Sequence, residues 1–287
     1  LGAGPALRLW RETGLNVVPA ETLCNIDRLI TRMPDVVVTG TGSGNFECSC
    51  WEWARKNRRP SMAMIDAWTN LAIRFQSETG IVYPDRIGVV DENAREQLAF
   101  EIGQDVGIDV VGQPYLQAQV SNLTKFRAVR EPASDKIELV FFSEPIDQDY
   151  GRDVRGFDQF DVFDDLIANL PFLPSLTLWV KPHPREEAEI WRKMLASRRE
   201  KGKLNAKFAS QSTNYLLSSV DAVIGMTSMA LVEAHLLRVP NLSLQPNRVK
   251  LINPVIEDVC EVIEERENLA ADLLRFLDDI DKKPLVN

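Results

Sequence analysis

Several features are missing from this sequence of 287 residues, and each absence excludes a class of protein. No apolar run approaches the ~20 residues that a membrane-spanning helix requires, so no integral membrane segment is expected. The net charge of −9 repels polyanions. No stripe of lysine and arginine interleaved with aromatic residues is present to overcome that repulsion locally. Nucleic acid is therefore not an expected partner.

Cysteine is also scarce, because the four residues are too few and too scattered for a disulfide framework. Cys48 and Cys50 stand two apart on an expected helix, which points them to different faces. Reduced, structural thiols are expected instead of metal ligands, and they indicate the cytoplasm. The first residue is Leu1, and nothing resembling a signal peptide follows it, so we expect a chain that begins inside a longer protein or was processed.

The sequence does contain short β-branched runs that alternate with helical patterns, in a composition typical of folded soluble proteins (45% hydrophobic, 26% charged). In the first part, strands are predicted at 35–39, 61–65, 86–90 and 108–111, and helices at 46–57 and 92–103. Continuous apolar runs indicate a parallel sheet covered on both faces, hence a doubly wound lobe. Such a lobe normally opens with a strand, a glycine-rich turn and a helix. That first β-α unit is expected to be absent or upstream.

Residues 120 to 135 are polar and charged and carry no strand signal, which marks a domain boundary. We therefore predict an N-terminal lobe (1–118), a linker (119–135) and a C-terminal lobe (136–287). In the second lobe, strands are predicted at 137–143, 176–181, 221–225 and 241–244, and helices at 157–169, 185–199, 213–219 and 228–237. This is again a parallel α/β pattern. A terminal helix is predicted within 261–280, able to pack on either lobe.

Two segments of the first lobe follow predicted strands, where ligands bind in open α/β sheets. Thr41, Gly42 and Ser43 form a turn whose backbone N–H groups could approach an anion, although a tight turn explains the glycine equally well. Asp66 would stand at the cleft mouth, where a general base for an acceptor hydroxyl has to be. The alternative of equal weight is a helix N-cap, with Trp68 as packing.

In the second lobe, His183 directly follows a predicted strand and stands between two prolines. Pro182 and Pro184 fix the backbone on either side of the imidazole, which reduces the entropy lost when a ligand binds. His183 is therefore predicted to be functional. His235, the other histidine, falls inside a helical run and is predicted to be a core or interface residue.

The segment from Gly225 to Ser228 ends another predicted strand and begins a helix. The free N–H groups of that helix start, with the hydroxyls of Thr227 and Ser228, form an anion site that needs no lysine. Glu233, further along the helix, could turn toward a ribose. Simple capping of the helix by Thr227 or Ser228 is the structural alternative.

The His183 and Thr227-Ser228 segments, in this order and spacing, resemble the GT-B glycosyltransferase superfamily, particularly bacterial capsule and cell-wall transferases that use CMP-sugars or CDP-alditols. In those proteins a His-Pro motif and a later Ser/Thr-Ser turn with a downstream glutamate hold the donor nucleotide. Residues 88–94 and 111–114 are similar to the end of a GT-B first lobe, so the resemblance extends over about 34–246.

The layout is also similar to the non-hydrolysing UDP-N-acetylglucosamine 2-epimerases. Two departures count against them: Thr41 stands where they bear an acidic residue, and Ser143-Glu144-Pro145 stands where they have a histidine.

The resemblance implies two Rossmann-like lobes and a metal-independent, inverting transfer of a sugar or alditol phosphate from a CMP-, CDP- or UDP-linked donor to a glycan or cell-surface polymer. Asp66 would deprotonate the acceptor, and the donor site would comprise Lys181, His183, Gly225, Thr227, Ser228 and Glu233. Thr41, Gly42, Ser43 and Trp68 would line the acceptor side. No cofactor is expected. The expected location is the cytoplasm, with peripheral association at the inner membrane face left open. A UDP-sugar 2-epimerase and a non-catalytic nucleotide- or glycan-binding protein are the alternatives.

Overall fold

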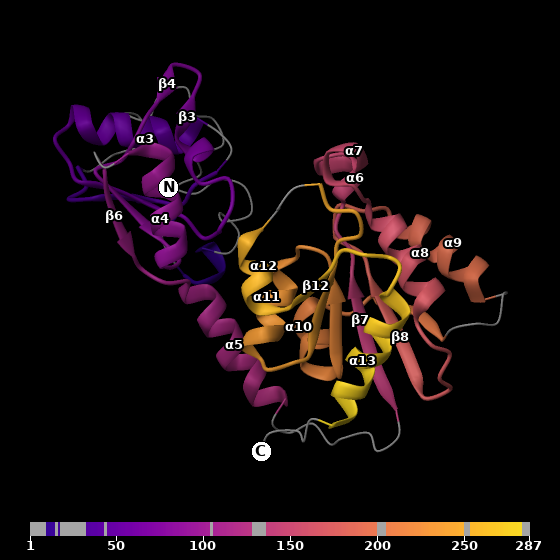
Figure 1. Ribbon diagram of the computed structural model, residues 1–287. Coiled ribbons are helices and arrows are strands. Elements are labelled where there is room, and N and C mark those ends of the chain that lie inside the picture. The colour runs from indigo at the N-terminus through magenta and orange to yellow at the C-terminus, as the bar shows by residue number, and fades with distance from the viewer. Residues whose placement is uncertain are drawn as a thin grey trace. The chain divides into compact units, whose positions relative to one another are not determined.

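The computed structural model describes residues 10–14, 17, 33–42, 45–103, 106–127, 136–199, 205–249 and 253–282. The chain divides into two compact units, Leu1–Gln113 and Pro114–Asn287, each built on a parallel sheet (Figure 1). Three predictions lie outside the described residues. They concern Cys24, Ser43 and the missing first β-α unit.

The first unit contains a four-stranded parallel sheet in the order β1-β2-β5-β6. Its main elements are β1 (Val37–Thr39), α3 (Asn45–Lys56), β2 (Ser61–Met64), β5 (Arg86–Val89), α4 (Glu92–Ile102) and β6 (Gly107–Val110). Between β2 and β5 lie η1 (Ala72–Phe75) and the antiparallel pair β3 (Gln76–Ser77) and β4 (Gly80–Ile81). The predicted strands and helices are confirmed to within two residues. Asp91 caps α4 by accepting the Ala94 N–H, as its position in the sequence predicts.

The three described cysteines, Cys48, Cys50 and Cys260, are free thiols. Cys48 and Cys50 are buried in α3, and burial raises the pKa of Cys50 to about 12. Burial also raises the pKa of Cys260 to about 12. Thiols that stay protonated are poor nucleophiles and poor metal ligands, so these residues pack as small apolar side chains.

The second unit contains a six-stranded parallel sheet in the order β12-β11-β10-β7-β8-β9. Its strands are β7 (Ile137–Phe142), β8 (Leu176–Lys181), β9 (Ala206–Phe208), β10 (Ala222–Gly225), β11 (Asn241–Leu244) and β12 (Glu261–Ile263). From β7 the chain moves outward through β8 to β9, then returns to place β10 on the other side of β7. The winding therefore reverses between β7 and β10, which is the arrangement of a complete dinucleotide-binding sheet.

The helices of the second unit are α5 (Pro114–Arg127), α6 (Ile146–Asp149), α7 (Arg152–Arg155), α8 (Gln159–Asn169), α9 (Ala188–Arg199), α10 (Thr213–Ser219), α11 (Met229–Leu236), α12 (Pro254–Val259) and α13 (Leu269–Lys282). Leu139 and Phe141 of β7 face a core that includes Trp191 of α9. Successive strand residues point to opposite faces, and Val140 and Phe142 are buried as well. The sheet is thus covered on both faces, as its continuous apolar strands predict.

The structure differs from the sequence prediction at two helices of the second unit. The segment expected to be a linker from residue 119 is helical up to Arg127, since α5 begins at Pro114. Only Leu116 and Leu123 of α5 are buried, so the apolar stripe was too weak to predict a helix. The terminal helix begins at Leu269, because Glu261–Ile263 pairs with β11 as a sixth strand. Leu269, Leu273 and Leu277 pack into the core of the second unit, which settles where α13 docks.

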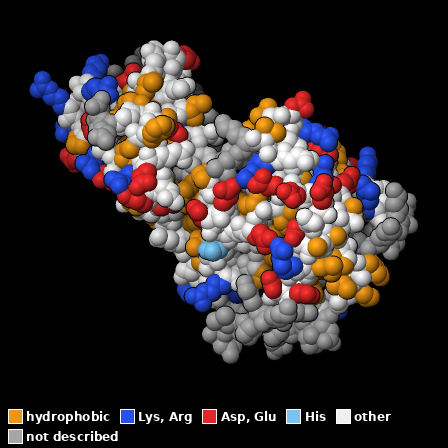
Figure 2. All heavy atoms as spheres, viewed as in Figure 1, with side chains coloured by type: hydrophobic (Ala, Val, Ile, Leu, Met, Phe, Trp, Pro, Cys, Tyr) orange, Lys and Arg blue, Asp and Glu red, His pale blue; other side chains and the backbone are white. Residues whose placement is uncertain are grey.

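Acidic and basic side chains are interspersed over the face of the molecule that Figure 2 shows. This distribution is that of a charged, mixed surface. Within the part of the chain that the structure describes, none of the helices combines the length and apolar content needed to cross a bilayer.

Gly156 lies where two segments of the second unit meet at van der Waals distance. It follows α7 with φ of 89°, and a Cβ at this position would stand 1.9 Å from the carbonyl oxygen of Asn247. We expect Gly156→Ala to destabilise the protein by clearly more than the roughly 1 kcal/mol typical of alanine at positive φ, because backbone atoms must move. Urea unfolding measures the loss.

Gly151→Ala is the matched control for that substitution. Gly151 also has a positive φ of 83°, but no atom lies within 4 Å of its would-be Cβ. Equal losses of stability for the two variants would contradict the prediction.

Candidate functional site

The candidate site lies at the carboxyl edge of the second sheet, around the reversal between β7 and β10. Phe142 of β7 pairs with Lys181 of β8, and Phe141 pairs with Ile224 of β10, so these three strands end side by side. Ligands of open α/β sheets bind at such a reversal. The segment after β8 carries His183 and the segment after β10 carries Thr227. The structure therefore brings the two predicted donor-site segments to one edge of one sheet.

The turn that presents His183 is held by the buried carboxylate of Glu186. Glu186 Oε2 accepts the backbone N–H of His183 at 2.6 Å, and the Glu186 N–H donates to the His183 carbonyl at 2.9 Å. Glu186 Oε1 accepts the Ser143 hydroxyl at 2.8 Å and the Trp191 indole N–H at 3.1 Å. One carboxylate thus joins the turn after β8, the end of β7 and the core under α9.

The imidazole of His183 is oriented by its own turn. Its Nδ1 accepts the backbone N–H of Arg185 at 3.2 Å, which leaves Nε2 to carry the hydrogen of the neutral ring. Burial, and secondarily the positive charge of Arg185, lower the pKa of His183, while Asp149 opposes them. Arg185 is itself paired with Asp149 through two contacts of 2.5 and 2.6 Å. His183 is therefore a neutral N–H donor at neutral pH.

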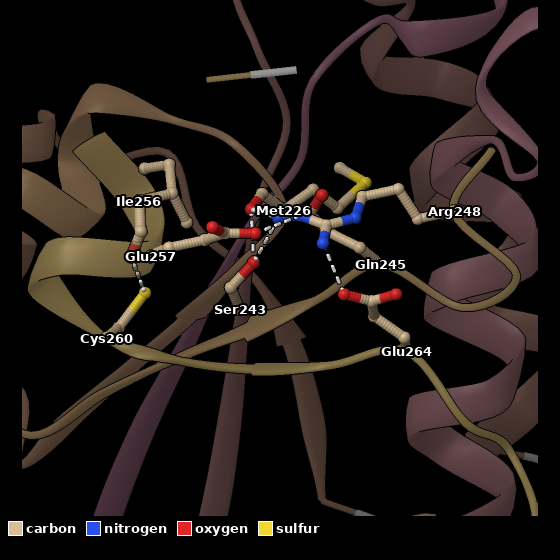
Figure 3. A network of polar contacts seen from close by, with 8 residues as sticks. All are labelled: Met226, Ser243, Gln245, Arg248, Ile256, Glu257, Cys260 and Glu264. Carbon is tan, nitrogen blue, oxygen red and sulfur yellow. Dashed lines mark hydrogen bonds and ion pairs between the residues drawn. The ribbon is translucent and has the colours of Figure 1, made fainter. Parts of the chain in front are cut away.

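The peptide between Met226 and Thr227, after β10, is fixed on both of its sides. Figure 3 shows Ser243 of β11 and Gln245 beside the Met226 carbonyl, which accepts from both side chains. The N–H of the same peptide unit, that of Thr227, donates to Glu144 Oε2 at 2.6 Å. Because the carbonyl and the N–H share one plane, the bonds to Met226 set the direction in which the Thr227 N–H points.

The contact of Glu144 with Thr227 is one that the sequence analysis did not predict, although it noted the segment Ser143-Glu144-Pro145. The second oxygen of Glu144 accepts the Thr227 hydroxyl at 3.0 Å, so both predicted anion donors of Thr227 are bound to a carboxylate of the protein. Ser228 caps α11 by accepting the Ala230 N–H at 3.2 Å, as the structural alternative predicts. The signal in the sequence that could have drawn attention to Glu144 is its position directly after the first strand of the second lobe.

The carboxyl group of Glu144 is enclosed by protein although part of the residue is exposed. Burial raises its pKa to about 7, the bonds from Thr227 oppose this, and the charges of Glu186 and Asp149 add to it. Near neutral pH the group is therefore divided between its charged and neutral forms.

Glu233, the predicted ribose ligand, lies on α11 with a buried Oε2 that has no hydrogen-bond partner. Burial raises its pKa. A buried acceptor without a partner is costly, and a ligand hydroxyl would satisfy it. The other two predicted donor-site residues are strand ends, since Lys181 is the last residue of β8 and Gly225 the last of β10.

Of the predicted site residues of the first unit, Asp66 is exposed, whereas Trp68 and Thr41 form hydrogen bonds within the unit. Asp66 is exposed after β2, and its carbonyl accepts from Gln113 at 3.5 Å. Trp68 is buried, as the packing alternative predicts, and its indole N–H donates to Asp91, the N-cap of α4. Thr41 accepts from Arg74 through its carbonyl (3.2 Å) and hydroxyl (3.1 Å), which holds the turn after β1.

Gly42 closes that turn tightly, because a Cβ there would lie 2.9 Å from the flexible carboxylate end of Glu47. Among the described residues, no three side chains of His, Cys, Asp or Glu are grouped so that they could hold a metal ion.

Comparison with known proteins shows the fold. No protein-family model matches the sequence, and no curated protein matches it. Among solved structures, UDP-GlcNAc 2-epimerase from Methanocaldococcus jannaschii has a TM-score of 0.56 and 16% identity, over 90% of this chain and 73% of that chain. UDP-GlcNAc 2-epimerase from Neisseria meningitidis bound to UDP-GlcNAc has a TM-score of 0.57 and 15% identity, over 88% and 70%. The S. aureus MnaA–UDP structure has a TM-score of 0.54 and 16% identity, over 86% of this chain and 66% of that chain.

These similarities confirm the predicted fold class. The chain has two Rossmann-like lobes of the GT-B type.

We expect Glu186→Gln to destabilise the protein by roughly 1 to 3 kcal/mol, because the amide must turn its NH₂ toward at least one N–H donor that the carboxylate accepts. Those donors are the His183 backbone N–H and the Trp191 indole. Chemical denaturation at neutral pH measures the change. Glu187→Gln, on the exposed neighbouring residue, is the control and should change stability little. A loss no larger than that of the control would show that the carboxylate does not hold the turn.

Proposed function

We propose that this protein is an enzyme that binds a nucleotide-activated sugar or alditol and transfers its sugar or alditol phosphate to a glycan or cell-surface polymer. One observation supports the donor site most directly. The proline-flanked imidazole of His183 and the start of α11 stand at the same edge of the second sheet, on either side of the reversal at β7. Phosphates of nucleotides bind at such edges and at helix N-termini.

The donor would be held from both sides of that edge. His183 offers its Nε2–H to a phosphate oxygen, and Lys181 at the end of β8 supplies positive charge. On the other side is the segment from Gly225 to Ser228, where the Thr227 N–H and hydroxyl, which donate to Glu144 in the free protein, would turn to the phosphate. Glu233 would accept from ribose hydroxyls through its unpartnered oxygen. These groups stabilise the departing nucleotide without a metal ion or cofactor.

The acceptor would be activated from the first unit. Asp66 is exposed and follows β2, so its carboxylate is free to take the proton of an acceptor hydroxyl as the bond to the donor forms. Thr41 and Gly42, which follow β1, would contact the acceptor, together with Ser43, the next residue in the sequence. Trp68 would support Asp66 through its bond to Asp91.

A 2-epimerase of UDP-sugars is the second candidate, favoured by the similar solved structures, two of which are UDP-GlcNAc 2-epimerases. Thr41 and Glu144, in place of the acidic residue and the histidine that the resemblance leads one to expect, count against it. An epimerase converts UDP-GlcNAc without acceptor, whereas a transferase releases nucleotide only when an acceptor is present. A non-catalytic binding protein would bind the donor and do neither.

We expect His183→Ala to abolish nucleotide binding without unfolding the protein, because the variant loses the oriented Nε2–H donor. The measurement is a thermal-shift screen against CMP, CDP, UDP, GDP and their sugars, in which a ligand at ~100 times its dissociation constant adds ~2.7 kcal/mol. His235→Ala is the matched control, since His235 is exposed on α11, contrary to a core placement. If His183→Ala binds as the parent does, the donor site is wrongly assigned.

We expect Asp66→Asn to keep the nucleotide shift and to lower turnover by about 100-fold or more, because the amide cannot accept the proton. Nucleotide release in the presence of a cell-wall glycan is the readout. Glu96→Gln removes another exposed carboxylate of the first unit and should leave turnover unchanged. Unchanged turnover in Asp66→Asn would remove Asp66 from the mechanism.

A further inference from the structure

The anion-binding groups at the end of β10 are already bound to an anion, and that anion belongs to the protein. Both oxygens of Glu144 are used, one by the Thr227 N–H at 2.6 Å and the other by the Thr227 hydroxyl at 3.0 Å. Glu144 reaches this position from the end of β7, across the reversal of the sheet. A phosphate bound by Thr227 would need the same two donors.

The carboxylate also repels a second anion at this place. Among the described residues, no lysine, arginine or histidine forms an ion pair with Glu144. The charges that raise its pKa are the carboxylates of Glu186, from the turn after β8, and Asp149, on α6. A phosphate brought to Thr227 would thus meet an uncompensated negative charge in a poorly hydrated position, where repulsion is strong.

We propose that Glu144 is an internal competitor of the donor phosphate, so that the donor binds only when this carboxyl group has taken up a proton. This inference rests on the proposed function, since it concerns the same phosphate site. A protonated Glu144 no longer repels the phosphate, and its O–H becomes a donor.

The proposal sets the direction of the pH dependence. The pKa of Glu144 is about 7 in the free protein, so the fraction that can bind the donor falls as the pH rises through neutrality. Apparent affinity scales with the competent fraction, which gives a loss of about tenfold from about pH 6 to about pH 8.

Two neighbouring groups also titrate. The pKa of His183 is lowered by burial and by Arg185, and the pKa of Glu186 is raised by burial. Titration of either group could also make donor binding depend on pH, so the test needs a variant in which only the titration of Glu144 is removed.

Glu144→Gln is that variant, because glutamine has nearly the same shape and is neutral at every pH. The amide oxygen can accept the Thr227 N–H, and its NH₂ can donate to the Thr227 hydroxyl oxygen, so the fold keeps both contacts. The probe is UDP-N-acetylglucosamine, whose pyrophosphate diester does not titrate near neutrality, measured by calorimetry at about pH 6 and about pH 8. Glu189→Gln, an exposed residue of α9, is the control.

We expect the parent protein and Glu189→Gln to lose about tenfold in affinity between these pH values, and Glu144→Gln to bind equally at both. A parent affinity that does not change with pH would overturn the inference and leave the proposed function standing. A loss that persists in Glu144→Gln would likewise overturn it and assign the titration to His183 or Glu186. Absence of UDP-N-acetylglucosamine binding in all three proteins at both pH values, together with no thermal shift from CMP, CDP, UDP, GDP or their sugars, would overturn the proposed function, and the inference with it.

Discussion

The parallel pairing of β7 with β10 is the constraint on which the rest of the second unit depends. These strands are separated in the chain by two β-α units, β8 and β9 with their helices, yet Phe141 and Ile224 lie opposite each other. Because both strands point the same way, the residues that follow them meet at one edge. Glu144 can reach Thr227 only for this reason. The same pairing places the reversal of the strand order between β7 and β10, where ligands of doubly wound sheets bind.

Two carboxylates at this edge show how surroundings give one side chain different roles. Glu186 accepts three hydrogen bonds, which offset much of the free-energy cost of burying its charge. Its bond from the His183 N–H holds the turn that carries His183. Glu144 has two bonds, both from Thr227, and two like charges nearby. The three bonds to the first group oppose the effect of burial on its pKa, whereas the second is close to balance between two protonation states. A group close to balance is the one that a ligand can shift.

The sequence predicted most strands of the fold, because a strand covered on both faces must be apolar throughout and so leaves a continuous run, as in β8 and β10. It predicted a fixed turn around His183 because prolines restrict the backbone whatever the tertiary structure does. It placed Glu144 after the first strand of the second lobe but could not predict its contact with Thr227, since a glutamate carries no mark of the partner it will meet 83 residues later. For the same reason Trp68 remained ambiguous until its contact with Asp91 was visible. The short strand β12 depends on pairing with β11, a long-range contact that outweighs the helical spacing of residues 261–280.

The charges at the carboxyl edge of the second sheet give the protonation of Glu144 an effect besides pH dependence. A phosphate site normally gains its attraction from lysine or arginine, but here Arg185 is already paired with Asp149 and His183 is neutral. The remaining attraction comes from Lys181 and from the partial positive charge at the start of α11. Neutralising one carboxylate changes the local charge by the same amount as adding one cation. Under the proposed mechanism, the proton on Glu144 therefore removes a negative charge that Lys181 and the start of α11 would otherwise have to offset.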